Sequence, residues 1–475
     1  MATLSVNALS GGSTQLSDEA LAGLRADLRG PLCLKGEPGY DAARTIWNAM
    51  IDRNPALIVR ALWAADVVRA VRFAGQHGLS VAVRGGGHNI AGNAVCEGGL
   101  MIDLSLMKSV RVDAATKRVR VEPGATLGDM DRETQTFGLA VPSGINSTTG
   151  VGGLTLGGGF GWLARKFGLT VDNLLSADVV TAAGELVRAS AADDPDLFWA
   201  IRGGGGNFGV ITSFEFQAHA VGPTVLAGLI VHPFAKAAEL LREYRKFVAQ
   251  APEELTCWAV LRQAPPLPFL PAEVHGTEVL VFAACWCGDM EAGVKAMAPL
   301  RALGKPFADV IGPSPFAGWQ TALDPLLTPG ARNYWKSHDF VEISDGLIDQ
   351  LLPAVGKLPS PDCEVFIGHL GGAVNRVPVS ATAYPHRDVL FVMNVHTRWN
   401  DAAQDKACIA WARDLFDRAT PFATGGVYVN FMPEDEGQRV SKGAYGANFE
   451  RLAKLKKRFD PSNVFRQNMN ISPVG

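Results

Sequence analysis

The 475-residue sequence lacks the features that mark membrane, secreted and nucleic-acid-binding proteins. It contains no run of about 18 apolar residues, the length that a membrane span needs. Its N-terminus has no basic segment followed by an apolar core, so we expect no signal peptide and a cytoplasmic location. The net charge is only −3, which gives no strong field to attract nucleic acid or an anionic membrane. We therefore expect neither of these as a partner.

Cysteine and the common hydrolase motifs are also scarce. The seven cysteines are odd in number and scattered, so we expect buried free thiols rather than a disulfide framework. None of the nine histidines forms a helical pair with a glutamate, and no G-x-S-x-G motif is present. Neither a catalytic metal nor a serine hydrolase is therefore expected. The G-x-G-x-x-G pattern at residues 204–209 lacks the following helix and acidic residue of a nicotinamide site.

Glycine, in contrast, is abundant and clustered, with 52 residues. Gly85, Gly86 and Gly87 follow the apolar segment 79–83 and lead into His88, and a second cluster occupies residues 150–161. Glycine lets a backbone approach a ligand closely, and consecutive free N–H groups bind anions. A single histidine is often a capping or core residue, but its place at the end of this loop favours contact with a ligand. The pattern predicts a large phosphate-bearing cofactor.

Hydrophobic periodicity predicts two unlike halves of the chain. Up to about residue 218, short strands alternate with helices, and Gly78 and the pair Ala183-Gly184 mark a helix end and a hairpin turn. Beyond it, long helices alternate with strands, which is typical of an antiparallel sheet with helices on one side. The predicted helices are 16–28, 65–77, 235–249, 291–303 and 449–459, and the predicted strands are 79–83, 100–104, 110–112, 119–121, 179–181, 186–188, 210–216, 279–283 and 389–395.

Four segments in this order resemble the FAD-linked oxidases of the vanillyl-alcohol-oxidase/PCMH superfamily. They resemble most closely the berberine-bridge-enzyme-like group, and within it the bacterial mono-covalent 6-hydroxynicotine-oxidase-like members. The segments are 84–88, 142–173, 196–211, and the end of the chain with 428–430, 445–448 and 456–465. The resemblance implies an α+β fold, namely a two-domain PCMH-type FAD-binding fold with an antiparallel-sheet substrate domain flanked by helices. An FAD-binding domain is expected over 1–218 and a substrate-binding domain over 219–423, with 424–475 packing on the FAD domain.

The resemblance further implies that FAD is bonded covalently to His88. Many relatives have a second bond from a cysteine, but this chain has Asn146 at that position, so a single link is expected. Thr149 falls where relatives control the access of oxygen to the flavin. The residues expected to bind the cofactor are Arg84, Gly85, Gly86, Gly87, His88, Asn89, Pro142, Ser143, Asn146, Thr149, Gly150, Gly152, Gly153, Gly157, Gly161, Gly206, Asn207, Gly209, Val210, Ile211, Tyr428 and Asn430.

The resemblance places the substrate over the flavin and beneath the sheet of the second domain. The strand over 389–399 is matched with the strand that carries the catalytic side chain, and here it offers Asn394 and, on the same face, His396. Tyr428 is the third catalytic candidate, and the strand over 334–338 offers further candidates, each of which could instead be a packed or surface-facing strand residue. Because Asn394 cannot act as a base, the absence of an obvious carboxylate slightly favours amine or N-heterocycle oxidation over alcohol oxidation. Three acidic residues could overturn this preference, namely Asp339, Glu342 and Glu364.

The expected function is therefore that of an FAD-dependent oxidase. It would transfer hydride from a C–N or C–O bond of a small organic molecule to the flavin, which O2 would reoxidise to give H2O2. The alternatives are a flavin dehydrogenase of the same fold with another electron acceptor, and a non-catalytic flavin-binding relative. The expected partners are a small-molecule substrate and molecular oxygen, and the protein is expected to be a monomer or a homodimer.

Overall fold

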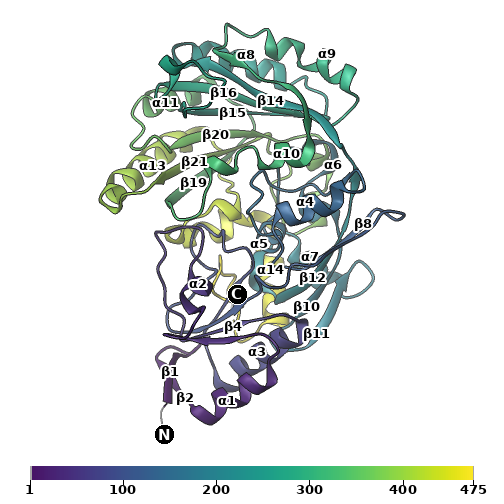
Figure 1. Cartoon of the computed structure of the whole chain (residues 1–475), viewed down its shortest axis with the longest axis vertical. Helices are drawn as coiled ribbons and strands as arrows, with labels where there is room; N and C mark the ends of the chain where they lie inside the picture. The colour runs from purple at the N-terminus through teal and green to yellow at the C-terminus, as the bar shows by residue number, and fades with distance from the viewer. Residues whose placement is uncertain (1–2, 474–475) are drawn as a thin grey trace.

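Two separate sheets build the first part of the chain in the computed structural model, which describes residues 3–473 (Figure 1). One has the strand order β3-β4-β6-β5, with parallel β4–β6 and β5–β6 pairs, and the other the antiparallel order β11-β10-β12-β8-β7. The strands are β3 (Leu32–Leu34), β4 (Leu57–Arg60), β5 (Val81–Arg84), β6 (Leu100–Asp103), β7 (Val110–Asp113), β8 (Arg118–Val121), β10 (Leu174–Val180), β11 (Leu186–Ser190) and β12 (Val210–Gln217). Two small pairs add β1 (Thr3–Asn7) to β2 (Ser13–Ser17), and β9 (Leu139–Ala140) to β13 (His219–Ala220).

Two helices of this part are bounded by the capping residues that the sequence predicts. The helix predicted over 16–28 begins after Ser17, whose hydroxyl accepts from the Ala20 N–H at 3.1 Å. The helix predicted over 65–77 ends at Gly78, whose φ of +61° suits glycine. Both predictions are confirmed. The helices are α1 (Asp18–Asp27), α2 (Tyr40–Arg44), α3 (Ala64–His77), α4 (Leu127–Gln135), α5 (Val151–Leu156), α6 (Ala164–Phe167) and α7 (Pro195–Ile201).

An eight-stranded antiparallel sheet forms the second part, at the top of Figure 1. Its order is β17-β14-β16-β15-β20-β21-β19, with β18 also paired to β14, and the long helices pack on one face around a large apolar core. The strands are β14 (Thr224–Pro233), β15 (Leu255–Gln263), β16 (Glu278–Trp286), β17 (Ala308–Asp309), β18 (Gly312–Pro315), β19 (Arg332–Phe340), β20 (Glu364–His369) and β21 (Phe391–Trp399). The helices are α8 (Ala237–Val248), α9 (Met290–Arg301), α10 (Phe316–Thr321), α11 (Asp345–Val355), α12 (Ala373–Arg376) and α13 (Asp405–Ala419). The predicted antiparallel sheet with helices on one side is confirmed.

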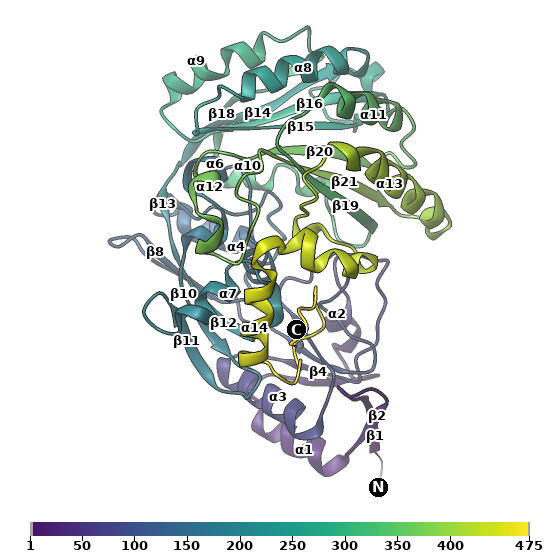
Figure 2. The same ribbon diagram turned by 180° about the vertical axis from the view of Figure 1, so that it is seen from behind.

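The end of the chain returns to the first part, where α14 (Phe449–Phe459) lies beside α7 and β12 (Figure 2). Val427, Tyr445 and Leu452 share an apolar core with Val119 and Trp199. The short pairing of β13 with β9 keeps residues 219–220 with the first part. The predicted domain boundaries stay predictions, and this pairing favours a boundary slightly beyond residue 218.

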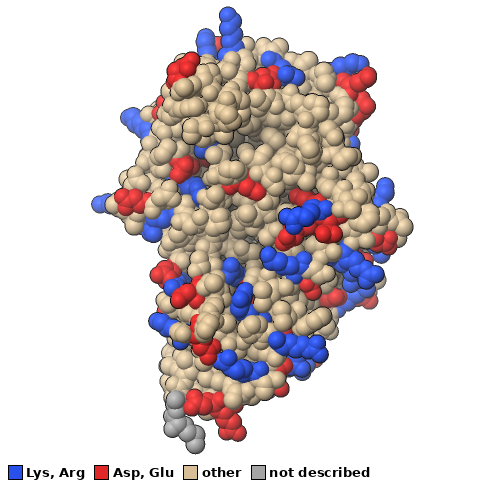
Figure 3. All heavy atoms as spheres, viewed as in Figure 1, with Lys and Arg blue, Asp and Glu red and all other residues tan. Residues whose placement is uncertain are grey.

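The surface carries no strong field of one sign on the face seen in Figure 3, where basic and acidic side chains are intermixed. All seven cysteines are free, and six of them are buried, as the odd count and scattered spacing predicted. Over residues 3–473, no helix combines the length and apolar character that crossing a membrane would require.

Candidate active site

The long helices cover one face of the eight-stranded sheet, and the other face points toward the first part of the chain (Figure 1). A cavity lies between this second face and the glycine loops of the first part. The loop after β5 and the loops on both sides of α5 form one wall, and strands β14, β15, β16, β19, β20 and β21 form the other. The C-terminal segment completes the cavity through Tyr428 to Phe431 and through residues 465–469. The two glycine clusters singled out in the sequence therefore face the same space as the strand that carries His396.

The two glycine loops touch each other directly in the wall of this cavity. A Cβ atom at Gly86 would lie 2.5 Å from the Cα of Gly150, and one at Gly150 would lie 2.5 Å from the nitrogen of Gly86. Real Cβ contacts are never that short, so both positions require glycine. Gly87, with a φ of +72°, then turns the chain toward His88.

The first loop is suited to an anionic ligand. Within residues 3–473, the backbone N–H groups of residues 85–89 donate to no protein acceptor. Residues 85–89 all line the cavity, as do Gly205 and Gly206 of the third segment. A row of free N–H groups on a backbone without side chains can hold a pyrophosphate without nearby basic side chains. These residues therefore fit the phosphate-bearing part of FAD.

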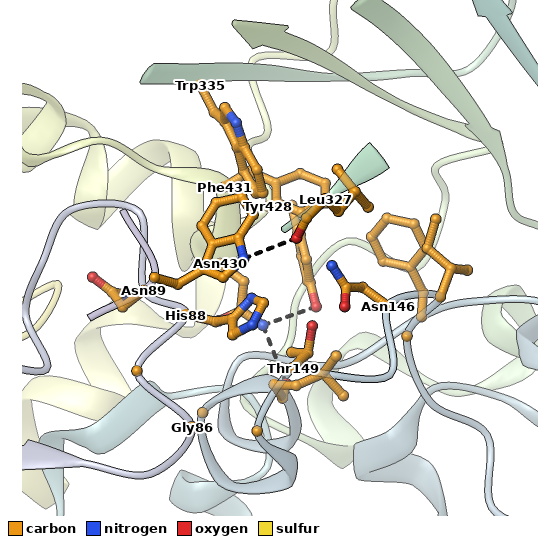
Figure 4. A pocket seen from close by; sticks show the side chains of 18 of the residues that line it. Gly86, His88, Asn89, Asn146, Thr149, Leu327, Trp335, Tyr428, Asn430 and Phe431 are labelled. Atoms are coloured by element: carbon orange, nitrogen blue, oxygen red, sulfur yellow. Dashed lines mark hydrogen bonds between the residues drawn. The ribbon is translucent and has the colours of Figure 1, made fainter. Parts of the chain in front are cut away.

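His88 sits in the cavity wall as a neutral ring of defined tautomer (Figure 4). Its Nε2 lies 2.9 Å from the Thr148 hydroxyl, which donates its own proton to Oδ1 of Asn146 at 2.7 Å. Thr148 must therefore accept from His88, so Nε2 carries the proton and Nδ1 keeps a lone pair. Burial lowers the pKa of His88 to about 3, which keeps the ring uncharged at neutral pH. Trp47 stacks on the ring with a centroid distance of 4.9 Å.

Tyr428 and Asn430 form a hydrogen-bonded pair on the floor of the cavity (Figure 4). The Tyr428 oxygen accepts from the Gly159 N–H and from Nδ2 of Asn430, both at 2.9 Å. Asn430 also donates to the Leu154 carbonyl at 3.1 Å and packs directly over Gly157. Burial raises the pKa of Tyr428 to about 12 although two donors face its oxygen. The phenol therefore stays protonated and has its own proton free to donate.

The sheet wall carries a row of charged and aromatic side chains at one level of the strands. The register pairs Arg262 with Glu364, Glu364 with His396, and His396 with Trp335, across β15, β20, β21 and β19. Arg262 Nη1 donates to Glu364 Oε2 at 2.7 Å, and His396 Nδ1 lies 3.0 Å from Glu364 Oε1. All four side chains line the cavity.

The Glu364 carboxylate lies between Arg262 and His396 and is itself charged. Burial opposes its ionisation, but Arg262 and His396 outweigh burial and lower the pKa of Glu364 to about 2. The carboxylate is therefore charged at neutral pH and accepts the proton on Nδ1 of His396. In the neutral imidazole, Nδ1 donates to this carboxylate and Nε2 keeps the lone pair; Nε2 has no hydrogen-bond partner among residues 3–473.

Aromatic contacts connect His396 with the floor of the cavity. Trp335 lies edge-on to His396 with ring centroids 4.5 Å apart, and Phe431 contacts Trp335 at 5.5 Å. Phe431 also contacts Tyr428 at 4.8 Å. The imidazole and the phenol therefore belong to one continuous wall around the same space.

Most of the predicted site residues line this cavity. Among the catalytic candidates, His396 and Tyr428 do so and Asn394 does not. The predicted cofactor residues in the lining are Gly85, Gly86, Gly87, His88, Asn89, Asn146, Thr149, Gly150, Gly152, Gly153, Gly206, Asn207, Gly209, Val210, Ile211, Tyr428 and Asn430. Those outside it are Arg84, Pro142, Ser143, Gly157 and Gly161.

The predicted residues outside the lining support the loops instead. The Arg84 guanidinium contacts the Ala43 carbonyl and lies 3.9 Å from Asp103, behind Gly87. The Pro142 carbonyl accepts from the Thr170 hydroxyl at 2.8 Å. Gly161 packs closely on the Ser143 carbonyl, and Gly157 on Asn430. These contacts support the backbone of the loops, and the predicted role of the five residues in binding the cofactor stays a prediction.

Asn394 faces the same side of the sheet as His396, as the alternation predicted, but it is fully buried. Its register partners are Phe366 and Ser337, and at this level the Phe366 ring, rather than Asn394, lines the cavity. Asn394 is therefore outside the cavity lining, and its predicted role toward the substrate stays a prediction. Alternation identifies the face of a strand, but neighbouring side chains decide which residues reach the surface of that face.

Several lining residues escaped the sequence analysis. Glu364 was named there but not placed, because only the β20–β21 register brings it beside His396. Arg262, Trp47 and Phe431 carried no motif, since their contacts cross between segments far apart in the chain.

The fold and the cavity define an FAD-dependent oxidoreductase, and comparison with known proteins agrees. Residues 55–190 match the family described as FAD binding domain, and residues 427–472 match the family described as Berberine and berberine like. The chain is 34% identical over 471 residues to an FAD-linked oxidoreductase of Dictyostelium discoideum, with 98% of each chain covered. It belongs to the berberine-bridge-enzyme-like family of FAD-linked oxidoreductases.

Three further comparisons show the range of this family. The chain is 32% identical over 474 residues to (R)-6-hydroxynicotine oxidase of Paenarthrobacter nicotinovorans, covering 95% of this chain and all of the relative. The solved structure of 6-hydroxy-D-nicotine oxidase from Arthrobacter nicotinovorans superposes with a TM-score of 0.84 at 29% identity, covering 94% and 98% of the two chains. A chitooligosaccharide oxidase superposes equally well, at 25% identity over 96% of this chain and 100% of that one. The predicted fold class and family are confirmed.

Proposed function

We propose that this protein is an FAD-dependent alcohol oxidase. It removes a hydride from the carbinol carbon of a small organic alcohol and passes the electrons to O2, giving H2O2. The observation that carries this proposal is the Glu364–His396 pair in the cavity lining, in which Nε2 of His396 is buried and has no hydrogen-bond partner among residues 3–473. The sequence analysis slightly favoured amines because no carboxylate was evident, and it named Glu364 as one of three residues that could overturn this preference. Glu364 lines the cavity beside His396, which supports the alcohol instead.

His396 is the base in this proposal. Oxidation of an alcohol requires loss of the hydroxyl proton, whereas an amine can use its nitrogen lone pair. Glu364 holds Nδ1–H, so Nε2 can accept the hydroxyl proton, and the carboxylate stabilises the imidazolium that forms. Arg262 balances the charge of Glu364. Bound FAD would supply the two-electron acceptor for the hydride.

Tyr428 positions the alcohol rather than acting as a base. Because its oxygen already accepts two hydrogen bonds, its remaining capacity is to donate. Its raised pKa, about 12, keeps that proton in place at neutral pH. Donation from Tyr428 and acceptance by His396 would together fix the substrate oxygen, which orients the carbinol C–H bond.

We also propose that FAD is held covalently through Nδ1 of His88 alone. The neutral ring and the free Nδ1 lone pair support this, since a bond to the flavin methyl carbon needs an unprotonated nitrogen. Gly85 to Gly87 and Gly150 would hold the pyrophosphate, and Asn146, which occupies the place of a second link, orients Thr148 instead.

The covalent link is tested by acid precipitation of the holoenzyme. Yellow colour and flavin fluorescence should stay with the wild-type chain, and His88→Ala should release all flavin into the supernatant. His77→Ala, at the end of α3 and outside the cavity lining, is the matched control and should behave as wild type. Free flavin from the wild type would exclude the link.

The alcohol oxidase assignment is tested with the flavin spectrum under argon. A panel of primary and secondary alcohols should bleach the oxidised flavin absorption, and matched amines should not. Admitting air should then restore the absorption with one H2O2 released per flavin. Bleaching without peroxide would favour the dehydrogenase alternative, and a flavin that no alcohol bleaches would favour the non-catalytic alternative or an amine substrate.

A further inference from the structure

One end of the cavity is lined by aliphatic side chains. On β14, β16 and β15, the register sets Val231, Val281 and Val260 side by side on the face toward the cavity. Leu229 lies two residues before Val231 on the same face of β14. We call this end, bounded by Leu229, Val231, Val260, Leu267, Leu270 and Val281, the apolar chamber.

Two loops close the apolar chamber with more hydrocarbon. The segment after β15 contributes Leu267 and Leu270, which belong to the same apolar cluster as Val231 and Val281. The segment between α10 and β19 contributes Leu323 and Leu326. Over residues 3–473, none of the side chains of the chamber can donate or accept a hydrogen bond.

The charged row lies at the boundary of the chamber. Val279, Arg262, Glu364 and His396 follow one another at one level of the sheet, and Val281 and Val260 occupy the next level. Arg262 is paired with Glu364, with Nη1 and Oε2 2.7 Å apart, so the Arg262 charge that lies beside the chamber is not unpaired. A bound molecule that reaches His396 would therefore have one polar end there and its body among aliphatic side chains.

A second cavity continues the apolar surface beyond the loops. It shares Leu229, Leu267, Leu323 and Leu326 with the first cavity and adds further apolar residues. Three of the four shared side chains, those of Leu267, Leu323 and Leu326, belong to the two loops. The added apolar residues include Phe269, Val310, Pro313 and Trp319.

We infer that the substrate is an alcohol with a hydrocarbon body, whose hydroxyl meets His396 and Tyr428 while its chain or ring fills the apolar chamber. This inference rests on the proposed alcohol oxidation. A sugar is disfavoured because its additional hydroxyls would lose water without gaining partners in the chamber. The aliphatic lining of the chamber would therefore distinguish the substrate of this chain from that of a relative whose name specifies an oligosaccharide, although the two share a fold.

The first test measures binding alone, with tertiary alcohols that have no carbinol hydrogen and cannot be oxidised. Calorimetric titration of the holoenzyme with 2-methyl-2-propanol, 2-methyl-2-hexanol and 2-methyl-2-octanol should give dissociation constants that fall about tenfold for every two added methylenes. Affinity that does not change with chain length would overturn the inference. This readout is independent of the oxidation chemistry.

Variants locate the binding to the chamber. Leu267→Asn should weaken binding of 2-methyl-2-octanol roughly fivefold or more and leave 2-methyl-2-propanol unchanged. Val281→Phe should reduce the space and remove the gain from the last added methylenes. Leu186→Asn, at a leucine that is 53% exposed on β11, is the matched control and should bind as wild type. Equal effects of Leu267→Asn and Leu186→Asn would place the hydrocarbon elsewhere.

Flavin bleaching by 1-octanol, ethanol and xylobiose separates the two proposals. Bleaching that is fastest at low concentration with 1-octanol supports both. Chain-length-dependent binding without bleaching by any alcohol would refute the alcohol oxidation and leave the apolar substrate body standing. Bleaching that is fastest with xylobiose would overturn the apolar substrate and keep the alcohol chemistry.

Discussion

Replacing His396 with alanine is expected to slow flavin reduction by alcohols by a factor of roughly 10² to 10⁴, the usual contribution of a positioned general base. Nε2 of His396 has no partner among residues 3–473, and Glu364 beside Nδ1 sets the tautomer of the neutral ring in which Nε2 is the acceptor. The fall should appear in the limiting rate of anaerobic flavin bleaching at saturating alcohol, measured by stopped flow.

Further measurements can show whether His396→Ala is slow because it lacks the base or because it is misfolded. Added imidazole should restore part of the rate in His396→Ala, because the side-chain space can admit the free base. Glu364→Gln, which keeps the shape but removes the charge, should reduce the rate less than His396→Ala and change its pH profile. His77→Ala should not alter the rate. A His396→Ala enzyme that oxidises alcohols at the wild-type rate would exclude His396 as the base, and Tyr428 would have to be reconsidered.

The cofactor side of this site could be predicted from local sequence, because glycine is a backbone requirement. Gly86 and Gly150 cannot carry side chains where the two loops touch, and Gly87 needs a positive φ. Such constraints act on single positions and leave a signal in the sequence. For this reason the loop ending in His88 was recognised and placed correctly in the cavity wall.

The substrate side could be predicted only in part, because it depends on register between strands distant in the chain. Alternation gave the correct face for His396, but it could not show that Phe366, rather than Asn394, reaches the cavity at the next level. It also could not bring Glu364 to His396, and this single pairing changes the preferred chemistry from amine to alcohol oxidation. A strand sequence records which face a residue takes, whereas its neighbours across the sheet are set by the whole fold.

Replacing Lys456 with methionine is expected to lower the free energy of unfolding by about 3–5 kcal/mol, the usual cost of leaving one partner of a buried ion pair alone. Lys456 and Asp460 are both fully buried at the end of α14, with Nζ and Oδ2 2.7 Å apart. Nζ also donates to the carbonyls of Asn207 at 2.8 Å and Phe465 at 3.1 Å, so it ties the C-terminal segment to the third glycine segment. Urea unfolding followed by tryptophan fluorescence would measure the change.

The neighbouring Lys457 provides the control, because it is exposed on the same helix and Lys457→Met should change the unfolding midpoint little. Lys456→Met combined with Asp460→Asn should recover part of the loss, since no unpaired charge then remains buried and an oxygen still accepts from the Val464 N–H. Because Asn207 and Phe465 both line the cavity, the single variant should also loosen the wall around the cofactor. Lys456→Met that is as stable as Lys457→Met would show that the pair does not hold the C-terminal segment in place.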